Sequence, residues 1–386
     1  MLTNNYSLEH IKIIGIVGTN GKTSTAKIMT HLLEEHGVST KYFHSADLVE
    51  KENRIISEYH QQPFQIAIIE MDLKDLNDDF FCHDFSFHVI VHTSFDFRHF
   101  ESFIEYESSM KKLNKFFSLL SNDGIVVMNI DDKYHMDFLE GIQNKLVLPY
   151  GLSSKATLTA SSIEMADAVN FLCCLQRGLT SVNDVEIEPM EFTVHSQLIG
   201  KHNIYNVLAA VALGLIFGVK SNTITDTLKE FKQIQRRMRT IYDQPFRIID
   251  DCSRNPSSYD AVFETLQGLD YENLHIINAI SSDKISDYRR NSLTIMNWLN
   301  GLRCKNIYTT TCSDILKPDF KDKKVKKIVQ QVFDKNNFGY KHFSRLEDAI
   351  KETLNTVQEK DLILLLGEAG MDQGERIVHK CLKEKF

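Results

Sequence analysis

Residues 13–29, which read IIGIVGTNGKTSTAKIM, decide the fold: an apolar run, a loop with glycines and the start of a helix follow one another. Gly15, Gly18 and Gly21 permit tight backbone turns and let main-chain N–H groups approach phosphate oxygens. The helix that follows adds the positive end of its dipole to the same anion site. The stretch therefore predicts a strand, a phosphate-binding loop and a helix, in that order.

The side chains that follow the last glycine of this loop suit a nucleotide and its metal ion. Lys22 would reach the terminal phosphates as a catalytic residue, and the hydroxyl of Thr23 would bind Mg²⁺. The alternative is a plain glycine turn between a strand and a helix, which would not need the intact Gly-Lys-Thr-Ser. The predicted nucleotide-binding residues of the loop are Gly18, Thr19, Asn20, Gly21, Lys22, Thr23 and Ser24.

Composition places the chain among ordinary globular proteins. Its 386 residues are 42% hydrophobic and 25% charged, which favours two domains with real cores. The formal net charge of −8 argues against a nucleic-acid binder, whose affinity depends on clustered lysine and arginine. No signal peptide is evident, and no apolar run reaches the ~18 residues that a membrane-spanning helix needs. The seven cysteines form no CxxC pair, so a cytoplasmic protein with free thiols is expected, without nucleic-acid or membrane partners.

Short apolar runs alternate with amphipathic stretches along most of the chain. Ile11–Val17, Ile66–Met71, His88–His92 and Ile125–Asn129 have the brief, β-branched character of buried strands. Helical spacing between them predicts an α/β fold with a mostly parallel sheet. Residues 155–200 differ and have the pattern of antiparallel strands, before strand-like runs resume at Phe246–Asp250. The boundary near Gln235 gives two predicted domains, residues 1–235 and residues 236–386.

The spacing of the glycines indicates a particular family. A general P-loop places its first glycine where Ile16 stands, whereas here Gly15 precedes the motif GTNGKT. This form resembles the Mur ligase family, in the manner of a MurE-like ATP-dependent amide ligase. The resemblance implies a P-loop central domain with a mostly parallel sheet and a C-terminal Rossmann-like α/β domain. It also implies ATP and Mg²⁺ as cofactors.

The same resemblance suggests metal ligands. Glu70 ends its strand as the metal-binding glutamate of the family does, and it would bind Mg²⁺ together with Thr23. The segment 88–101, HVIVHTSFDFRHFE, is similar to a strand followed by T-N-x-x-x-D-H-L-D, with His99 as a further metal ligand and catalytic residue. The alternatives are a chance acid at a strand end for Glu70 and an ordinary surface histidine for His99.

Family ligases carry a carbamoylated lysine shortly after this segment. Counting without gaps from His99 leads to Leu113, and counting back from the turn at Asp123 leads to the same residue. A slip of one residue would restore the lysine at Lys112. The sequence therefore leaves Lys112 and Leu113 as alternatives, and a solvated lysine face is the other interpretation.

The match to the family strengthens towards the domain boundary. Asn129-Ile130-Asp131-Asp132 resembles the strand-end N-x-D-D of the middle domain. Residues 198–210, LIGKHNIYNVLAA, resemble G-x-H/F-N-x-x-N-x-x-A-A, with Asn203 and Asn206 in family positions near the nucleotide. Asn203 could instead cap a helix.

In the second domain the resemblance is partial. Arg237 fits the arginine of the family's G-R-x-E, and IDDCSRNP, residues 249–256, resembles D-Y-A-H-N-P. Asp251 and Asn255 are thereby implied to contact ATP, with Asp251 as a catalytic residue that acts when the domains close. The acceptor motifs of the family are replaced, so the specificity for the amine cannot be transferred.

The function implied is an ATP-dependent carboxylate–amine ligase that works through an acyl phosphate on small-molecule substrates. The phosphate loop starts so early that the family's UDP-substrate domain is expected to be missing. A substrate other than the usual UDP-sugar-peptide is then expected, with a partner protein supplying the missing domain as a further possibility. Two alternatives remain: a nucleotide-binding pseudoenzyme or partner subunit with a degenerate acceptor site, and a P-loop phosphotransferase or ATPase of another kind.

Overall fold

The structure is a computed structural model that describes residues 11–50, 54–81, 86–100, 102–280, 285–316, 322–335 and 339–385. The chain divides into two compact units. The first unit runs to Gln197 and includes Lys201–Phe231, and the second comprises Leu198–Gly200 and the chain from Lys232 onward. Among the described residues, no helix is both long and apolar enough to cross a bilayer.

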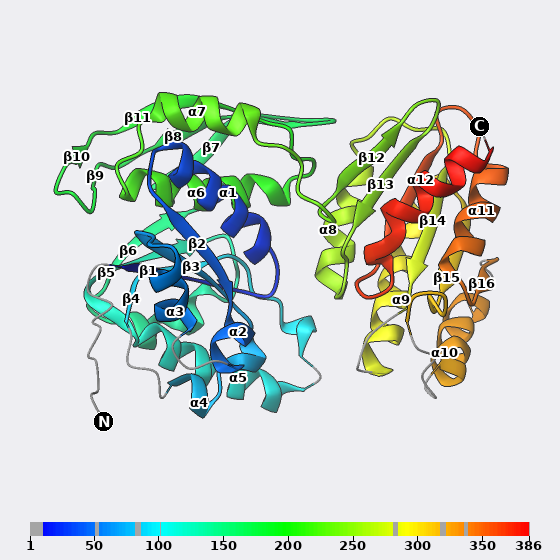
Figure 1. Ribbon diagram of the computed structural model, residues 1–386, viewed down its shortest axis with the longest axis horizontal. Coiled ribbons are helices and arrows are strands. Elements are labelled where there is room, and N and C mark those ends of the chain that lie inside the picture. The colour runs from blue at the N-terminus through cyan, green and yellow to red at the C-terminus, as the bar shows by residue number, and fades with distance from the viewer. Residues whose placement is uncertain are drawn as a thin grey trace. The chain divides into compact units, whose positions relative to one another are not determined.

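The first unit is built on a large sheet whose strands alternate with helices along the chain (Figure 1). The strands of this unit are β1 (Lys12–Val17), β2 (Thr40–His44), β3 (Ile66–Met71), β4 (Phe87–His92), β5 (Leu120–Asn129), β6 (Leu146–Tyr150), β7 (Leu158–Met165), β8 (Val169–Leu175), β9 (Leu179–Thr180), β10 (Glu186–Ile187) and β11 (Met190–Ser196). The helices are α1 (Lys22–Glu35), α2 (Ser45–Glu50), α3 (Arg54–Gln61), α4 (Asp78–Phe81), α5 (Phe103–Phe117), α6 (His202–Ile216) and α7 (Ser221–Glu230), with short 3₁₀ helices η2 (Leu73–Asp75), η3 (Phe97–His99) and η4 (His135–Ile142).

Within the described residues, this sheet has nine strands in the order β11-β8-β7-β6-β5-β4-β1-β3-β2. The strands from β2 across to β7 are parallel, and β8 and β11 add an antiparallel edge. The antiparallel character expected of residues 155–200 is therefore confirmed. Because β1, β3 and β4 are adjacent and parallel, the polar residues that follow them gather at one edge of the sheet.

Each face of the sheet is covered by helices. Helices α1, α6 and α7 pack together on one face, where α6 contacts β5 to β8. The other face carries a cluster of buried aromatic and aliphatic side chains contributed by β4, α5 and η4, among them Phe87, Phe116 and Phe138. Strands buried on both faces need apolar residues throughout, which explains the continuous apolar run of β1.

The second unit is a smaller α/β sheet (Figure 1). Its strands are β12 (Arg239–Asp243), β13 (Arg247–Asp251), β14 (Leu274–Ala279), β15 (Cys304–Thr310), β16 (Lys341–Phe343) and β17 (Leu362–Leu366). Its helices are α8 (Pro256–Leu266), α9 (Ile285–Leu299), α10 (Asp322–Lys335), α11 (Leu346–Thr356) and α12 (Gly374–Lys385), with the 3₁₀ helix η5 (Met371–Gln373). The order of the described strands is β12-β13-β17-β14-β15-β16, and only β12 runs antiparallel to its neighbour. The α/β class predicted for both parts of the chain is confirmed.

His342 on the edge strand β16 provides a pH-dependent contribution to the stability of this unit. Burial, reinforced by Lys326, lowers the pKa of His342 from 6.5 to about 4. The unfolded chain therefore binds more protons within this window, and the free energy of unfolding should fall as the pH drops from 6.5 towards 4. We expect the free energy of unfolding of His342→Gln to decrease by on the order of 1–2 kcal/mol less than that of the wild type over this pH range, after allowance for the partial exposure of the ring.

Urea unfolding of the wild type and the variant at pH 7 and pH 4.5 would measure this difference. His379→Gln is the matched control, because the His379 side chain is 48% exposed. An equal loss of stability in His342→Gln and in the wild type would contradict the prediction.

Candidate nucleotide-binding site

The loop between β1 and α1 has the backbone of a phosphate-binding loop. Gly18 has φ 151°, and Gly21, the residue before the first turn of α1, has φ 85°. A Cβ atom on Gly18 would lie 2.2 Å from Thr93 Oγ1, so only glycine fits there. The first N–H groups of α1 have no partner inside the helix, and they are suited to bind an anion.

Gly15 has a different role from the one that the sequence suggested. It lies inside β1, and a Cβ atom there would come within 2.9 Å of ring atoms of Phe87 and Phe116. Gly15 therefore makes room for two aromatic rings in the core beneath the sheet and takes no part in a turn. The prediction that all three glycines shape the loop is wrong for this one.

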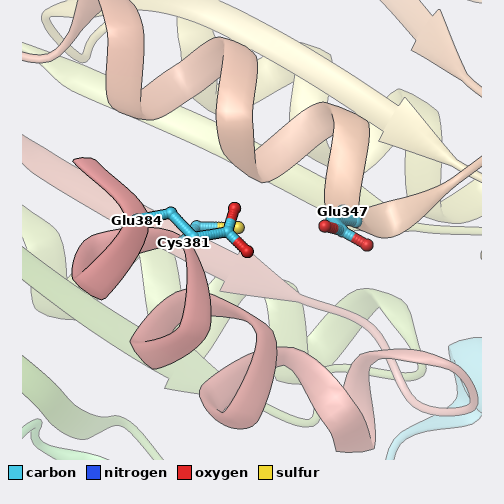
Figure 2. Close-up of side chains that lie close together, drawn as sticks. All are labelled: Glu347, Cys381 and Glu384. Carbon is cyan, nitrogen blue, oxygen red and sulfur yellow. The ribbon is translucent and has the colours of Figure 1, made fainter.

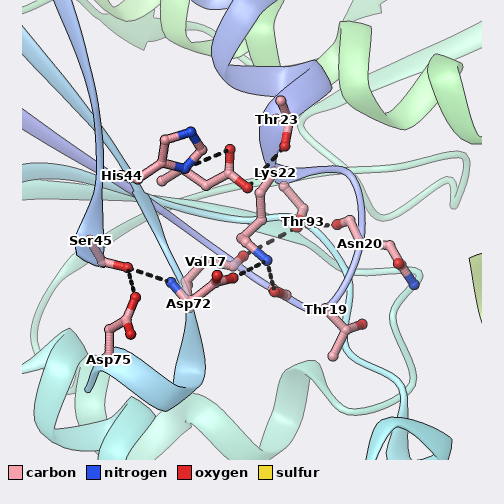
Figure 3. Close-up of polar contacts among 12 residues, drawn as sticks. Val17, Thr19, Asn20, Lys22, Thr23, His44, Ser45, Asp72, Asp75 and Thr93 are labelled. Carbon is pink, nitrogen blue, oxygen red and sulfur yellow. Dashed lines mark hydrogen bonds and ion pairs between the residues drawn. The ribbon is translucent and has the colours of Figure 1, made fainter. Parts of the chain in front are cut away.

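Lys22, the first residue of α1, is buried with its ammonium group in the loop (Figure 3). Its Nζ donates to the carbonyl oxygen of Gly18 at 3.0 Å and lies 3.1 Å from Oδ1 of Asp72. Asp72 follows β3 directly and belongs to none of the motifs recognised in the sequence. Only the adjacency of β1 and β3 brings this carboxylate to the lysine.

Glu70 and Thr23 meet at the end of β3. The Thr23 hydroxyl donates to Glu70 Oε1 at 2.9 Å, and the Tyr42 hydroxyl donates to Oε2 at 2.5 Å. Nδ1 of His44 lies 4.0 Å from the same Oε2 (Figure 3). Tyr42 and His44 come from β2, which pairs with β3, so sequence spacing alone could not place them here.

The Thr23–Glu70 pair fits a divalent cation. Mg²⁺ prefers oxygen ligands at ~2.1 Å in an octahedron, which puts neighbouring ligand oxygens about 3 Å apart. The separation of 2.9 Å between Thr23 Oγ1 and Glu70 Oε1 matches that spacing. Glu70 is only 6% exposed, so a cation would compensate a carboxylate that is otherwise costly to bury.

The segment after β4 braces the loop. Thr93 Oγ1 donates to the Asn20 carbonyl oxygen at 2.7 Å, and the N–H of Thr19 donates to the Ser94 carbonyl oxygen at 2.7 Å. Asn129 Nδ2 holds this segment by donating to the Thr93 carbonyl oxygen at 2.7 Å, and Asp132 Oδ2 accepts from the Phe95 N–H at 2.5 Å. The N-x-D-D motif therefore supports the segment that supports the phosphate loop.

The neighbourhood of His99 is only partly described. His99 ends the 3₁₀ helix η3, but its side chain lies outside the described residues, so its metal-ligand role stays a prediction. Leu113 is 1% exposed and belongs to the core on the inner face of α5. Lys112, the alternative position for the carbamoylated lysine, is half-buried. The buried residues of helix α5, which is described throughout, include no lysine.

Asn203 and Asn206 lie on α6 and are both buried. Asn206 Nδ2 donates to Asn203 Oδ1 at 2.9 Å, and Asn206 Oδ1 lies 3.4 Å from the hydroxyl oxygen of Thr25 on α1. A Cβ atom on Gly21 would lie 2.6 Å from Asn206 Oδ1, so this amide supports the underside of the loop. Helix α6 begins at His202 after Lys201, so the alternative of Asn203 as the helix cap is wrong.

In the second unit, polar residues gather where β13 and β17 end. Arg236 donates to Oδ1 of Asp250 and to the carbonyl oxygens of Gly367 and Glu368. Burial raises the pKa of Asp250 to about 6, although the Arg236 guanidinium opposes the rise. Arg236 thus holds the chain after β17, whereas the family motif in the sequence pointed to the neighbouring Arg237.

The predicted second-unit residues have structural partners. Asp251 Oδ2 accepts from the Met238 N–H at 2.9 Å, and its Oδ1 accepts from the Ser253 hydroxyl at 2.6 Å. Asn255 caps α8 by accepting from the Ser258 N–H at 2.9 Å, in a reciprocal capping box. Arg237 Nη1 donates to the Arg236 carbonyl oxygen at 2.9 Å. Their contacts with ATP stay predictions.

One other group of side chains in the described residues has metal-ligand chemistry: Glu347, Cys381 and Glu384 (Figure 2). Lysines already neutralise it, because Glu347 Oε1 lies 2.8 Å from Lys351 Nζ and 2.9 Å from Lys380 Nζ. These lysines lower the pKa of Glu347 to about 2. The cluster is an ion-pair network between α11 and α12, so the candidate cation site is the one at Glu70.

Two protein-family models match this chain. A model of the Mur ligase middle domain matches residues 16–214, which is more than half of the chain. The chain belongs to the Mur ligase family. A model of the Mur ligase glutamate ligase domain matches residues 236–369 of the same chain. The resemblance inferred from the phosphate loop is confirmed.

Curated members of the Mur ligase family match much of this chain. The UDP-N-acetylmuramoyl-L-alanyl-D-glutamate–2,6-diaminopimelate ligase of Halalkalibacterium halodurans is 27% identical over 300 residues, covering 71% of this chain and 58% of the relative. The UDP-N-acetylmuramate–L-alanine ligase of Vesicomyosocius okutanii is 28% identical over 273 residues, covering 68% and 54%. The chain therefore spans little more than half the length of these curated relatives.

Solved Mur ligase structures share the fold. MurF from Acinetobacter baumannii superposes with a TM-score of 0.72 at 16% identity, covering 97% of this chain and 77% of that one. MurF from Thermotoga maritima, solved in complex with ADP, has a TM-score of 0.70 at 14% identity, with 98% and 82% covered. At such identities the similarity establishes the architecture of the two units.

Glu70 offers a direct test of the cation site in this Mur ligase family member. We expect Glu70→Gln to raise the Mg²⁺ concentration needed for half-maximal nucleotide binding by at least about tenfold, because a ligand oxygen loses its charge. A Mg²⁺ titration of nucleotide binding would measure the shift. Glu35→Gln, at the exposed end of α1, is the control with the same loss of charge. An unaltered Mg²⁺ titration would contradict the assignment of Glu70 as a metal ligand.

Proposed function

We propose that this chain is an ATP-dependent carboxylate–amine ligase that forms an amide bond through an acyl phosphate. The observation that carries the proposal is a phosphate loop of the Mur ligase type in which the Lys22 ammonium binds the loop carbonyl of Gly18 and the next residue, Thr23, donates to Glu70 of β3. Lys22 brings positive charge to the loop, and Thr23 and Glu70 offer paired oxygens beside it. A nucleotide triphosphate and a divalent cation are the ligands that fit such a set.

A carboxylate is a poor electrophile at neutral pH, so phosphorylation provides the leaving group. A carboxylate oxygen of the substrate attacks the γ-phosphorus of ATP, ADP departs, and an acyl phosphate forms. The amine nitrogen then attacks the carbonyl carbon, phosphate leaves, and the nitrogen loses a proton. The Lys22 ammonium would stabilise charge on the transferring phosphoryl group, whose catalysis depends on positioning and electrostatics. Mg²⁺ would neutralise further phosphate charge, held by Thr23 and Glu70.

The remaining predicted residues are part of the proposal. His99 as a further metal ligand, Asn203 and Asn206 near the nucleotide, and Arg237, Asp251 and Asn255 of the second unit are proposed to contact the nucleotide or its metal. Asn206 has the most direct support, since its amide lies beneath Gly21. The cytoplasmic location and a partner protein that supplies a further domain stay predictions.

Phosphate release from Mg-ATP by the purified protein would test the function. The substrates are pools of carboxylates with pools of amino acids, and one pool contains a UDP-sugar-peptide. Release that requires both a carboxylate and an amine supports the ligase, and dividing the pools identifies the pair. Release only in the pool that contains the UDP-sugar-peptide would contradict the expectation from the sequence that the substrate is a different carboxylate. ATP binding without substrate-dependent release in any pool would contradict the ligase and favour a nucleotide-binding pseudoenzyme.

A further inference from the structure

Asp72 lies in the phosphate site but has no part in the reaction proposed above. Its carboxylate is 3.1 Å from the Lys22 ammonium, and its side chain is 37% exposed while that of Lys22 is 8% exposed. Asp72 therefore contacts the buried lysine from the solvent side of the site. Phosphate oxygens that bind Lys22 must approach the same ammonium group, which Asp72 already neutralises.

A second set of contacts fixes Asp72 in place (Figure 3). The Asp72 N–H donates at 2.9 Å to the hydroxyl of Ser45, the first residue of α2. Ser45 is 1% exposed and in turn donates to Asp75 Oδ2 at 2.7 Å. The backbone of Asp72 is thus tied to α2 and η2 at the point where β3 ends. The position of its carboxylate beside Lys22 is built into the fold.

The charges at this site are unfavourable for phosphate alone. Glu70 is near the end of β3, and Asp72 follows that strand directly. The Asp72 carboxylate is paired with Lys22, and the Glu70 carboxylate accepts from the neighbouring Thr23. The β- and γ-phosphates of a nucleotide would add several negative charges next to them, and like charges repel strongly at short range in a partly buried site. A divalent cation that arrives with the nucleotide would cancel much of that charge.

We propose that Asp72 is a positioning residue that couples nucleotide binding to the divalent cation. It holds the Lys22 ammonium in the loop when no nucleotide is bound, and it repels phosphates that arrive without a metal ion. The inference rests on the proposed function of the phosphate loop. It predicts that the chain discriminates between metal-free and metal-bound nucleotide more strongly than Lys22 and Glu70 alone would allow.

The test compares the Kd for AMP-PNP, a non-hydrolysable ATP analogue, in excess Mg²⁺ and in EDTA by calorimetry. We expect Asp72→Asn to tighten metal-free binding, so that the ratio of the Kd in EDTA to the Kd in Mg²⁺ falls about tenfold. The matched control is Asp78→Asn, which removes the same charge from a fully exposed side chain nearby in the sequence. That control should leave the ratio unchanged. Ser45→Ala removes the tie to the Asp72 backbone and should lower the ratio by a smaller factor.

Several outcomes would overturn the inference. These are an unchanged ratio in Asp72→Asn, an equal fall in Asp78→Asn, and weaker binding of Mg-AMP-PNP with unaltered metal-free binding, which would make Asp72 a metal ligand instead. If Asp72→Asn does not fold, as judged by circular dichroism, an unchanged ratio in folded Ser45→Ala would contradict the inference instead. A wild-type chain that binds no nucleotide in Mg²⁺ would contradict the proposed function itself, whereas binding with an unchanged ratio contradicts only this inference.

Discussion

Replacing Lys22 with alanine is expected to reduce ATP-dependent phosphate release by about 10²–10³-fold, or ~3–4 kcal/mol of transition-state stabilisation. The lysine is the one cation that the described phosphate loop brings within hydrogen-bond distance of its own carbonyl oxygens. Its removal leaves the Asp72 carboxylate without the ammonium group that it pairs with, so nucleotide binding should weaken as well. Single-turnover phosphate release and nucleotide binding, measured together, would separate the two effects.

Lys27→Ala is the matched control, because Lys27 lies on the exposed face of the same helix. It removes the same side chain and charge but leaves the loop untouched, so its rate should stay close to that of the wild type. A Lys22→Ala protein that is folded and turns over at the wild-type rate would exclude the phosphate loop from the reaction.

Gly18→Ala should destabilise the first unit and abolish nucleotide binding. The residue has φ 151°, and a Cβ atom there would come within 2.2 Å of Thr93 Oγ1 and 2.7 Å of the Ser94 carbonyl oxygen. The loop or the segment after β4 must move to relieve these contacts, and the hydrogen bond from Thr93 to the Asn20 carbonyl oxygen would be lost. We expect a loss of about 2–3 kcal/mol of stability, measured by urea unfolding.

Gly37→Ala separates the steric effect from the backbone effect. Gly37 follows α1 with φ 83°, and a Cβ atom there would meet nothing within 4 Å. This control should therefore cost only about 1 kcal/mol, from the backbone conformation alone, and nucleotide binding should persist. If both substitutions lowered the stability equally, the contact between the new Cβ atom and Thr93 would contribute nothing to the loss in Gly18→Ala.

Local sequence was sufficient to predict the parts of the site that are contiguous along the chain. The apolar run of β1, the glycines at 18 and 21 and the helix after Lys22 predict a strand, a loop and a helix, and the structure has all three. Glu70 was proposed as a partner of Thr23 because it resembles the family's metal-binding glutamate and ends a parallel strand, where ligand-binding residues lie. The motif spacing was specific enough to identify the family before the fold was known.

The remaining features depend on which strands lie side by side. Tyr42, His44 and Asp72 approach the loop only because β3 lies between β1 and β2, and no periodicity in the sequence encodes that order. Gly15 was misinterpreted for a related reason, since the aromatic rings that pack on it come from β4 and α5. Arg236 was missed because its partners, Asp250 and the chain after β17, are distant in sequence.

The short segment Leu198–Gly200 has a consequence for the chain as a whole. It belongs to the second unit, where Ile199 is buried in the core, although β11 before it and α6 after it belong to the first. The polypeptide therefore passes between the units three times, and neither unit is a continuous piece of sequence. A fragment that ends at residue 231 would carry Ile199 without the apolar cluster that covers it, and the complementary fragment would have a gap in its interior. Cutting this chain after residue 231 would therefore remove Ile199 from the core in which it is buried.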